Sequence, residues 1–204
     1  SASNVTISDC TISGNTANRD GGGIFCNYGQ HSNPTITDCT ISDNMASDSG
    51  GGIYCDSSSP AIIGCTISNN TADGGGGIYC DSSNPIFTNC TISNNTALES
   101  GGIAIYNSSE PTISGCTITG NTADYDGGGI YCNNNSNPTI SGCTISGNTA
   151  KYEGGGIYCK DNSSPTISVS VICENAPDQV NGIIGLPEGS LVSDSCLGSN
   201  TTGA

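Results

Sequence analysis

Short segments along the chain alternate apolar and polar residues with a period of two. In Cys10-Thr11-Ile12-Ser13 the first and third residues share one face, and in Ile24-Phe25-Cys26 the outer two do. A third segment of this kind follows a proline, as in Pro34-Thr35-Ile36-Thr37. Gly, Asn, Asp and Ser, which favour turns, separate the segments. The pattern predicts three short strands that point Ile and Cys inward and Thr, Ser and Phe25 outward.

These segments recur at a nearly constant interval. The cysteines that open the Cys-Thr-Ile segments lie 29, 26, 25, 26 and 27 residues apart: Cys10, Cys39, Cys65, Cys90, Cys116 and Cys143. Repeats of this length indicate a solenoid or array, and no segment has the 3.6-residue apolar stripe of a helix. We therefore predict an all-β fold, a parallel β-helix of about seven rungs of 25–29 residues over 1–176. Residues 177–204 leave the pattern and are predicted to form a non-repeat C-terminal cap or docking segment.

One asparagine falls five residues after the position that opens the Cys-Thr-Ile strand in every repeat. An Asn repeated at a turn favours an internal ladder, in which each amide binds its neighbour and the backbone of the bend. The predicted ladder consists of Asn15, Asn44, Asn70, Asn95, Asn121, Asn148 and Asn175. An alanine follows two residues later in the first six repeats, where a small side chain would fit inside the corner.

The combination of Asn-x-Ala, Gly-Gly-Gly-Ile-Tyr and Thr-Ile-Ser resembles the right-handed, single-stranded parallel β-helices of the pectate-lyase-like superfamily. It is most similar to the repeats of polymorphic outer-membrane proteins, which carry Gly-Gly-Ala-Ile and Phe-x-x-Asn. The resemblance covers roughly residues 4–176, and it departs in having Gly for Ala and two Cys in most rungs. Because this superfamily includes lyases, hydrolases, adhesins and structural rods, the resemblance implies a fold and not an activity.

The charge of the chain argues against two classes of binding partner. Its net charge is −15, with only three Lys plus Arg among 204 residues, so nucleic acid and anionic membrane surfaces are not expected partners. No apolar run is long enough to span a bilayer, so no membrane insertion is expected. The thirteen cysteines favour an oxidising compartment, which predicts a secreted or cell-surface protein.

The number of cysteines is odd, so at least one thiol has no partner within the chain. Three arrangements compete: bridges within each repeat, bridges from one repeat to the opening cysteine of the next, and two columns of unoxidised thiols. We predict the first, because it leaves only Cys90 unpaired, Ile105 standing where its partner would be. The predicted bridges are Cys10–Cys26, Cys39–Cys55, Cys65–Cys80, Cys116–Cys132, Cys143–Cys159 and Cys173–Cys196.

No catalytic pattern is present. The candidate bases Arg19, His31, Lys151 and Lys160 all fall in turns and no nucleophile accompanies them, so we expect no enzymatic activity. An acidic residue precedes the Gly-rich segment in successive repeats and forms a weak candidate site for calcium, which takes oxygen ligands. The solvated-loop interpretation is preferred, and no cofactor is otherwise expected. These residues are Asp20, Asp48, Asp73, Glu99, Asp126 and Glu153.

Two outward columns could bind ligands. Outward-facing rows of Thr-x-Ser, one of which begins at Thr11, are similar to the rows on ice-binding β-solenoids. Stacked aromatic rings, the second column, can bind glycans. Both also suit a plain pleated surface. The predicted aromatic column, interrupted by Ala104, consists of Phe25, Tyr54, Tyr79, Tyr131 and Tyr158.

We therefore predict a non-enzymatic structural β-solenoid, a subunit of a head-to-tail filament or stalk. The first rung lacks an obvious cap, and open solenoid ends favour self-association end to end. The alternatives are a surface adhesin or carbohydrate-binding module and an ice-binding β-solenoid.

Overall fold

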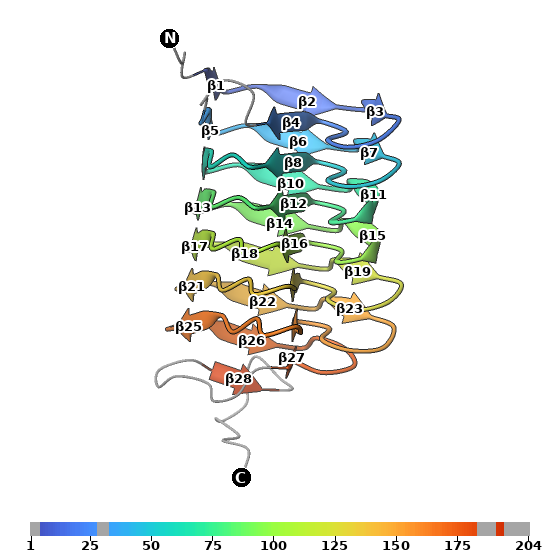
Figure 1. The fold of residues 1–204 in the computed structure, drawn as a ribbon, viewed down its shortest axis with the longest axis vertical. Coiled ribbons are helices and arrows are strands. Elements are labelled where there is room, and N and C mark those ends of the chain that lie inside the picture. Colours follow the sequence, from blue (N-terminus) through green and yellow to red (C-terminus); the bar gives the residue numbers. More distant parts are fainter. Residues whose placement is uncertain (1–4, 28–32, 183–190, 194–204) are drawn as a thin grey trace.

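The chain winds into a right-handed rod of parallel β-strands (Figure 1). The computed structural model describes residues 5–27, 33–182 and 191–193. Each complete rung contributes one strand to each of four sheets, and every strand pairs in parallel with strands of neighbouring rungs. This confirms the predicted all-β parallel β-helix of about seven rungs. None of the described residues form a helix long and apolar enough to span a bilayer.

The four sheets are the walls of the rod, and each follows one position of the repeat. Sheet A contains β1 (Thr6–Ser8), β5 (Thr35–Thr37), β9 (Ala61–Ile63), β13 (Ile86–Thr88), β17 (Thr112–Ser114), β21 (Thr139–Ser141) and β25 (Thr166–Ser168). Sheet B contains β2 (Thr11–Ser13), β6 (Thr40–Ser42), β10 (Thr66–Ser68), β14 (Thr91–Ser93), β18 (Thr117–Thr119), β22 (Thr144–Ser146), β26 (Val171–Cys173) and β28 (Leu191–Ser193). Sheet C contains β3 (Thr16–Ala17), β7 (Met45–Ala46), β11 (Thr71–Gly74), β15 (Thr96–Glu99), β19 (Thr122–Ala123) and β23 (Thr149–Ala150). Sheet D contains β4 (Ile24–Asn27), β8 (Ile53–Asp56), β12 (Ile78–Asp81), β16 (Ile103–Tyr106), β20 (Ile130–Cys132), β24 (Ile157–Cys159) and β27 (Val180–Asn181).

The core consists of apolar side chains stacked along the rod axis. In the second rung Ile36, Ile41 and Ile53 come from sheets A, B and D, and all three are fully buried. The predicted inward direction of Ile and Cys is confirmed, because alternation leaves the flanking Thr and Ser outside. Sheet C was not predicted as a strand. Four of its six strands are only two residues long, too short to show alternation, and we expected only a corner there.

The asparagines predicted as a ladder lie in one column at the bend between sheets B and C. Asn95 is fully buried, and its Nδ2 donates to Oδ1 of Asn121 in the next rung and to the carbonyl of Ile67, at 3.0 Å each. Its backbone N–H donates to the same Asn121 oxygen at 3.0 Å. At the far end the ladder continues through Gln179, whose Oε1 accepts from the backbone N–H and from Nδ2 of Asn175 at 3.0 Å each.

A second ladder, which we did not predict, lies between sheets D and A. Two residues before the proline that precedes a sheet A strand, five described rungs carry a buried serine, and from the second of these on its hydroxyl oxygen accepts the backbone N–H of the serine one rung earlier. Ser83 accepts from Ser58 at 3.0 Å, and Ser109 accepts from Ser83 at 2.9 Å. The column consists of Ser58, Ser83, Ser109, Ser136 and Ser163.

The five predicted within-repeat disulfides are not formed. Cys10–Cys26, Cys39–Cys55, Cys65–Cys80, Cys116–Cys132 and Cys143–Cys159 are all replaced by free thiols, and Cys90, predicted as the one unpaired cysteine, is free like the other ten. The reason is the register. One series opens sheet B and the other lies in sheet D, so each cysteine aligns with its equivalent in the next rung, as Cys26 does with Cys55. Cys196, the predicted partner of Cys173, lies outside the described residues.

The described part of the C-terminal segment joins the same rod. β27 extends sheet D beside β24, and β28 extends sheet B beside β26. Gln179, next to β27 in sequence, completes the Asn ladder. These strands therefore add to the end of their own solenoid.

Candidate functional site: an aromatic and acidic groove

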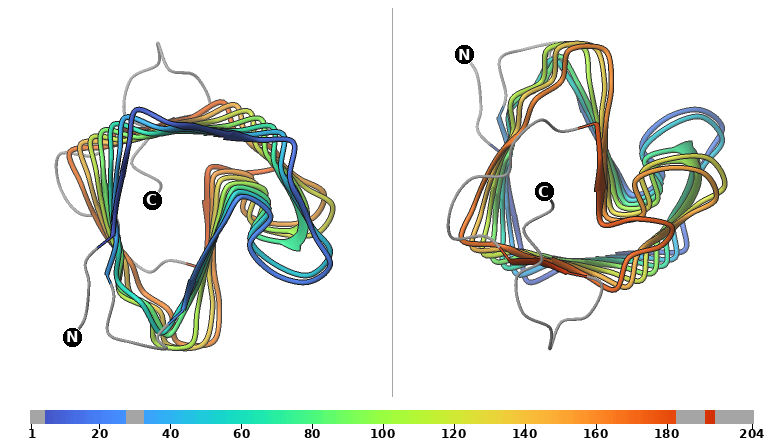
Figure 2. Two further views of the ribbon diagram at one scale, coloured as in Figure 1. Left: turned by 90° about the horizontal axis from the view of Figure 1, so that it is seen from above. Right: turned by 90° about the horizontal axis from the view of Figure 1, so that it is seen from below.

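Lobes between sheets C and D build a groove along the rod. After each sheet C strand the chain loops outward and then folds back to begin the sheet D strand, so the lobes stand beside the outer face of sheet D (Figure 2). Glycine permits this return. A Cβ on Gly76 would overlap the carbonyl oxygen of Thr96, and one on Gly51 would lie 2.5 Å from that of Thr71. The Gly-rich segments therefore hold sheet D against sheet C by close backbone contact.

The outer face of sheet D carries the aromatic column. Phe25 and Tyr54 stack with ring centroids 5.3 Å apart, as do Tyr54 and Tyr79. Tyr131 and Tyr158 are also 5.3 Å apart but tilted by 41°. Phe25 at one end is 48% exposed and Tyr131 is only 1% exposed, while the other rings, including Tyr158 at the far end, are half-buried, so most of the column is reachable only along its edges.

Tyr106 closes the gap that we expected at Ala104. Its ring lies 5.1 Å from that of Tyr79 and 5.4 Å from that of Tyr131, which makes six consecutive stacked rings. Tyr106 aligns with Asp81, two residues beyond the register of the other rings, and therefore shares their face of the sheet. The sequence shows this as Ile103-Ala104-Ile105-Tyr106, where the tyrosine comes two residues after the position that carries the aromatic ring in the other rungs.

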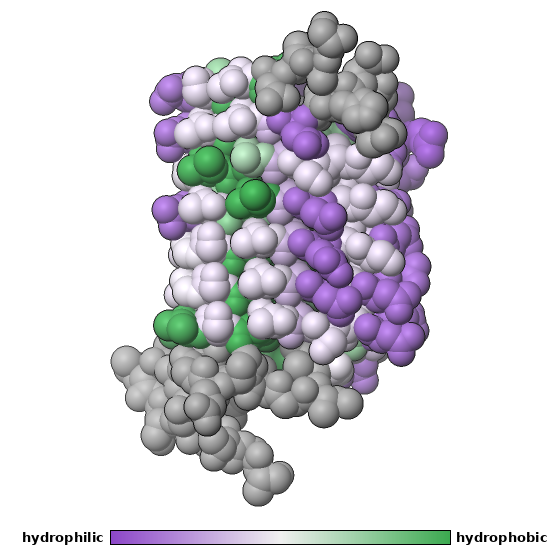
Figure 3. Space-filling model, turned by 60° about the vertical axis from the view of Figure 1, so that its left-hand side comes forward, coloured by the Kyte–Doolittle hydropathy of each residue, from purple (hydrophilic) through white to green (hydrophobic). Residues whose placement is uncertain are grey.

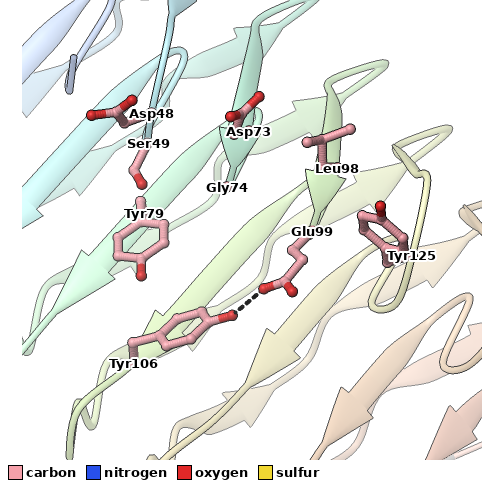
Figure 4. Close-up of a pocket in the computed structure, with 9 residues that line it drawn as sticks. All are labelled: Asp48, Ser49, Asp73, Gly74, Tyr79, Leu98, Glu99, Tyr106 and Tyr125. Atoms are coloured by element: carbon pink, nitrogen blue, oxygen red, sulfur yellow. Dashed lines mark hydrogen bonds between the residues drawn. The ribbon is translucent and has the colours of Figure 1, made fainter.

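Acidic side chains line the other side of the groove. A cavity of about 370 Å³ is bounded by Asp48 from a lobe, by Asp73 and Glu99 at the ends of sheet C strands, and by Tyr79, Tyr106 and Tyr125, together with Ser49, Gly74 and Leu98. Glu99 points across it and accepts a hydrogen bond from Tyr106 Oη at 2.8 Å (Figure 4). The groove thus combines negative charge with phenol edges.

The surroundings shift the pKa values of several of these groups. Burial raises the pKa of Asp20, Arg19 partly offsets this, and the charge of Asp48 adds to it. Burial likewise raises the pKa of Asp126, with the charge of Glu153 adding to it. Burial, followed by the charges of Asp81 and Asp20, raises the pKa of Tyr54 to about 12. Burial and like charges along the groove therefore disfavour ionisation of these side chains.

The six acidic residues considered for calcium lie in successive rungs, Asp73 and Glu99 at the ends of sheet C strands and the other four in the lobes that follow these strands. Arg19 Nε lies 3.6 Å from the carboxylate of Asp48, and Glu99 is engaged by Tyr106. In the described residues no three His, Cys, Asp or Glu side chains converge as a metal site. The structure therefore distributes these carboxylates along the rod.

The three candidate bases that the structure describes, Arg19, Lys151 and Lys160, each contact another side chain. Lys160 Nζ lies 5.3 Å from the Tyr131 ring centre, and Tyr131 raises the pKa of this lysine. Lys151 Nζ lies 5.1 Å from the Tyr152 ring centre, and Tyr152 raises its pKa as well. A raised pKa keeps both amines protonated at neutral pH, the wrong state for a general base. His31 lies outside the described residues.

Threonine and serine ranks cover the outer walls. On sheet B, Thr11, Thr40 and Thr66 align in register, as do Ser13, Ser42 and Ser68, and the ranks continue through β22. The face that carries sheet A is mostly of intermediate hydropathy with scattered apolar side chains (Figure 3), among them the exposed Ile63 and Ile86. Ice binding by such ranks stays a prediction.

Comparison with known proteins agrees with this architecture. The family described as right handed beta helix region matches residues 1–72 and 46–203. The chain belongs to this right-handed β-helix family. Comparison with curated proteins and with solved structures finds no significant match. Membership accounts for the handedness and the parallel stacking, while the likeness to polymorphic outer-membrane protein repeats stays a prediction.

Proposed function

We propose that this β-helix is a non-enzymatic structural rod, secreted or displayed at the cell surface. The observation that carries the proposal is the continuity of its internal columns. The asparagine ladder runs from Asn15 to Asn175 with one hydrogen-bonded amide in each rung, and aromatic stacking runs from Phe25 to Tyr158. Such stacking makes each rung the support of the next, which suits a stiff spacer.

The chemistry of the side chains supports a non-catalytic role. Arg19 pairs with Asp48, and the two lysines sit at aromatic rings with raised pKa values. The eleven free thiols among the described residues are buried, apart from the exposed Cys10. A nucleophile must be reachable and paired with a base, and these groups are not arranged so.

End-to-end association is part of the proposal. β1, β2, β3 and β4 are edge strands, and the edges of parallel strands are templates for further pairing. Beside them a cavity of about 340 Å³ is lined by Val5, Ile7, Ile24, Phe25, Cys26, Asn27 and Pro34. We propose that the rung at the opposite end of a second copy covers this surface and continues the columns.

The test is electron microscopy of the purified chain across a concentration series, with sedimentation velocity in parallel. We expect linear particles whose length grows with concentration. A charge substitution at Ile7, Ile7→Lys, places an ammonium group on the end surface and should shorten them. The matched control Thr117→Lys adds the same charge to the outer wall of sheet B in the middle of the rod and should leave the length unchanged.

A second candidate function is glycan binding in the groove, favoured by the cavity that joins Tyr125 to the acidic side chains. The column rings use their faces to stack on one another, so their edges and the carboxylates would meet sugar hydroxyls. Tyr125 is 46% exposed and is the ring available from the lobes. Tyr125→Ala should abolish retention on a glycan array, whereas Tyr152→Ala, which removes its stacking neighbour outside this cavity, should weaken it less. Equal retention by both variants and the parent chain would dismiss this candidate.

A further inference from the structure

Free thiols form two columns along the rod. The corner column opens sheet B and consists of Cys10, Cys39, Cys65, Cys90, Cys116 and Cys143. The sheet D column consists of Cys26, Cys55 and Cys80, and beyond Ile105 of Cys132 and Cys159. Together they contain eleven thiols, and all but Cys10 are buried.

Within each column the nearest thiol belongs to the adjacent rung. Cys26 aligns with Cys55, Cys55 with Cys80, and Cys132 with Cys159. Neighbouring strands lie about 4.8 Å apart, which is inside the Cα separation of about 4.4–6.8 Å that a disulfide spans. The in-register position thus satisfies the first geometric requirement for a bridge between rungs.

The thiols also interact along the axis. In the corner column the backbone N–H of Cys90 donates to Cys116 Sγ at 3.4 Å, which brings the Cys116 sulfur back over the preceding rung. In sheet D the Cys55 thiol, followed by burial, raises the pKa of the Cys26 thiol, and Cys159 acts on the pKa of Cys132 in the same way. These interactions all join successive rungs.

We propose that these columns are disulfide-forming sites that join neighbouring rungs when a small-molecule disulfide is present as oxidant. The corner column divides into the pairs Cys10–Cys39, Cys65–Cys90 and Cys116–Cys143. In sheet D, Cys132 pairs with Cys159 and Cys55 pairs with one of its two neighbours. The eleven thiols form five bridges and leave one, either Cys26 or Cys80, because Ile105 interrupts the column.

The reaction is thiol–disulfide exchange. As two rungs dock, a thiolate from one attacks a sulfur of the small-molecule disulfide and releases one small thiolate. The cysteine of the adjacent rung, after losing its proton, attacks the resulting mixed disulfide and releases the second. The protein loses two protons and two electrons, and the oxidant becomes two small thiols. Each bridge ties a rung to its neighbour, independently of the function proposed above.

Peptide mapping tests the connectivity. The chain is refolded with oxidised and reduced glutathione, alkylated without reduction and cut at aspartates and glutamates. Cleavage after Asp20 and Asp38 puts Cys10, Cys26 and Cys39 on three separate peptides. Cleavage after Asp73 and Asp81 likewise separates Cys65, Cys80 and Cys90. We expect cross-links between Cys10 and Cys39 and between Cys65 and Cys90. Links from Cys10 to Cys26 or from Cys65 to Cys80 would overturn the proposal, and so would full alkylation of all eleven thiols.

The interruption at Ile105 allows a gain-of-function test. Ile105 is fully buried and aligns with Cys80 and Cys132, so Ile105→Cys completes the sheet D column. The twelve thiols should then form six bridges, with a new Cys80 cross-link to position 105 and no alkylated thiol left in the columns. Ile105→Ser creates a similar loss of volume without a thiol and should keep one alkylated cysteine. Cleavage at Glu99 puts Cys90 and position 105 on separate peptides, so a disulfide between them can be detected. Such a link would support bridges within a repeat and refute the proposal.

Discussion

Removing one amide from the middle of the asparagine ladder should destabilise the whole rod. Asn95 is fully buried and takes part in four side-chain hydrogen bonds. Asn95→Ala leaves the backbone N–H of Asn70 and the carbonyl of Ile67 without the partner they have now. Each orphaned buried group costs about 1–3 kcal/mol, so the loss is about 4 kcal/mol. Asn70 Nδ2 keeps its bond to the Ile41 carbonyl, which limits the damage.

Asn15→Ala is the matched control. Asn15 occupies the same position of the first rung but is exposed, and its side chain makes one hydrogen bond, to Asn44 Oδ1 at 2.9 Å. Asn44 Oδ1 still accepts from the backbone N–H of Asn15 after the substitution. The expected cost is therefore only about 1 kcal/mol.

Urea denaturation followed by circular dichroism, in reducing buffer, measures both variants. With a slope of about 2 kcal/mol per M, Asn95→Ala should lower the midpoint by about 2 M and the control by about 0.5 M. A changed slope would indicate that end rungs unfold separately. Equal midpoints for the two variants would refute the role assigned to the buried ladder.

Three further predictions follow from the groove and its supports. Gly76→Ala should cost about 3 kcal/mol by denaturation, because its Cβ would overlap the Thr96 carbonyl. Gly74→Ala should cost less, because its Cβ would meet side chains only, the Tyr79 ring at 3.2 Å and Ser49 Oγ at 3.5 Å. Tyr106→Ala should lower the free energy of unfolding by about 2 kcal/mol, because it removes two ring contacts. Tyr106→Phe keeps both contacts and loses only the hydrogen bond to Glu99, so it should cost about 1 kcal/mol or less. Equal losses in the two variants would contradict the stacking argument. The pKa of Tyr54 is raised to about 12 in the folded state, so the neutral phenol contributes its full stabilisation of the fold below the ordinary tyrosine pKa, and this contribution is lost as pH rises through 12. Absorbance titration of the parent chain and of Tyr54→Phe should reveal this late ionisation. A midpoint near the ordinary tyrosine value would contradict the argument.

Features that repeat in register could be predicted from the sequence. A residue that returns at the same place in each rung, such as Asn95 or Ile67, must lie above its equivalents once the strands stack in parallel. Strand parity then decides whether it points inward. The ladder serines carried an equally regular signal, two residues before the proline that opens each sheet A strand from Pro60 to Pro165, that our sequence reasoning missed.

Features that depend on distances between walls could not be predicted. Sequence spacing does not show how far Cys10 lies from Cys26, so we preferred pairing within a repeat because it left the fewest cysteines over, and that prediction was wrong. The groove depends on lobes that fold back over sheet D, a path set by close backbone contact at Gly76 and its equivalents. Tyr106 reaches the aromatic column because its ring occupies space vacated at Ala104, which only the packed side chains show.

The direct measurement of the structural role is electron microscopy of the purified chain at high concentration. A rod that stacks end to end predicts linear particles that lengthen with concentration and shorten in Ile7→Lys. Dispersed single rods at every concentration, with no difference between Ile7→Lys and Thr117→Lys, would contradict it.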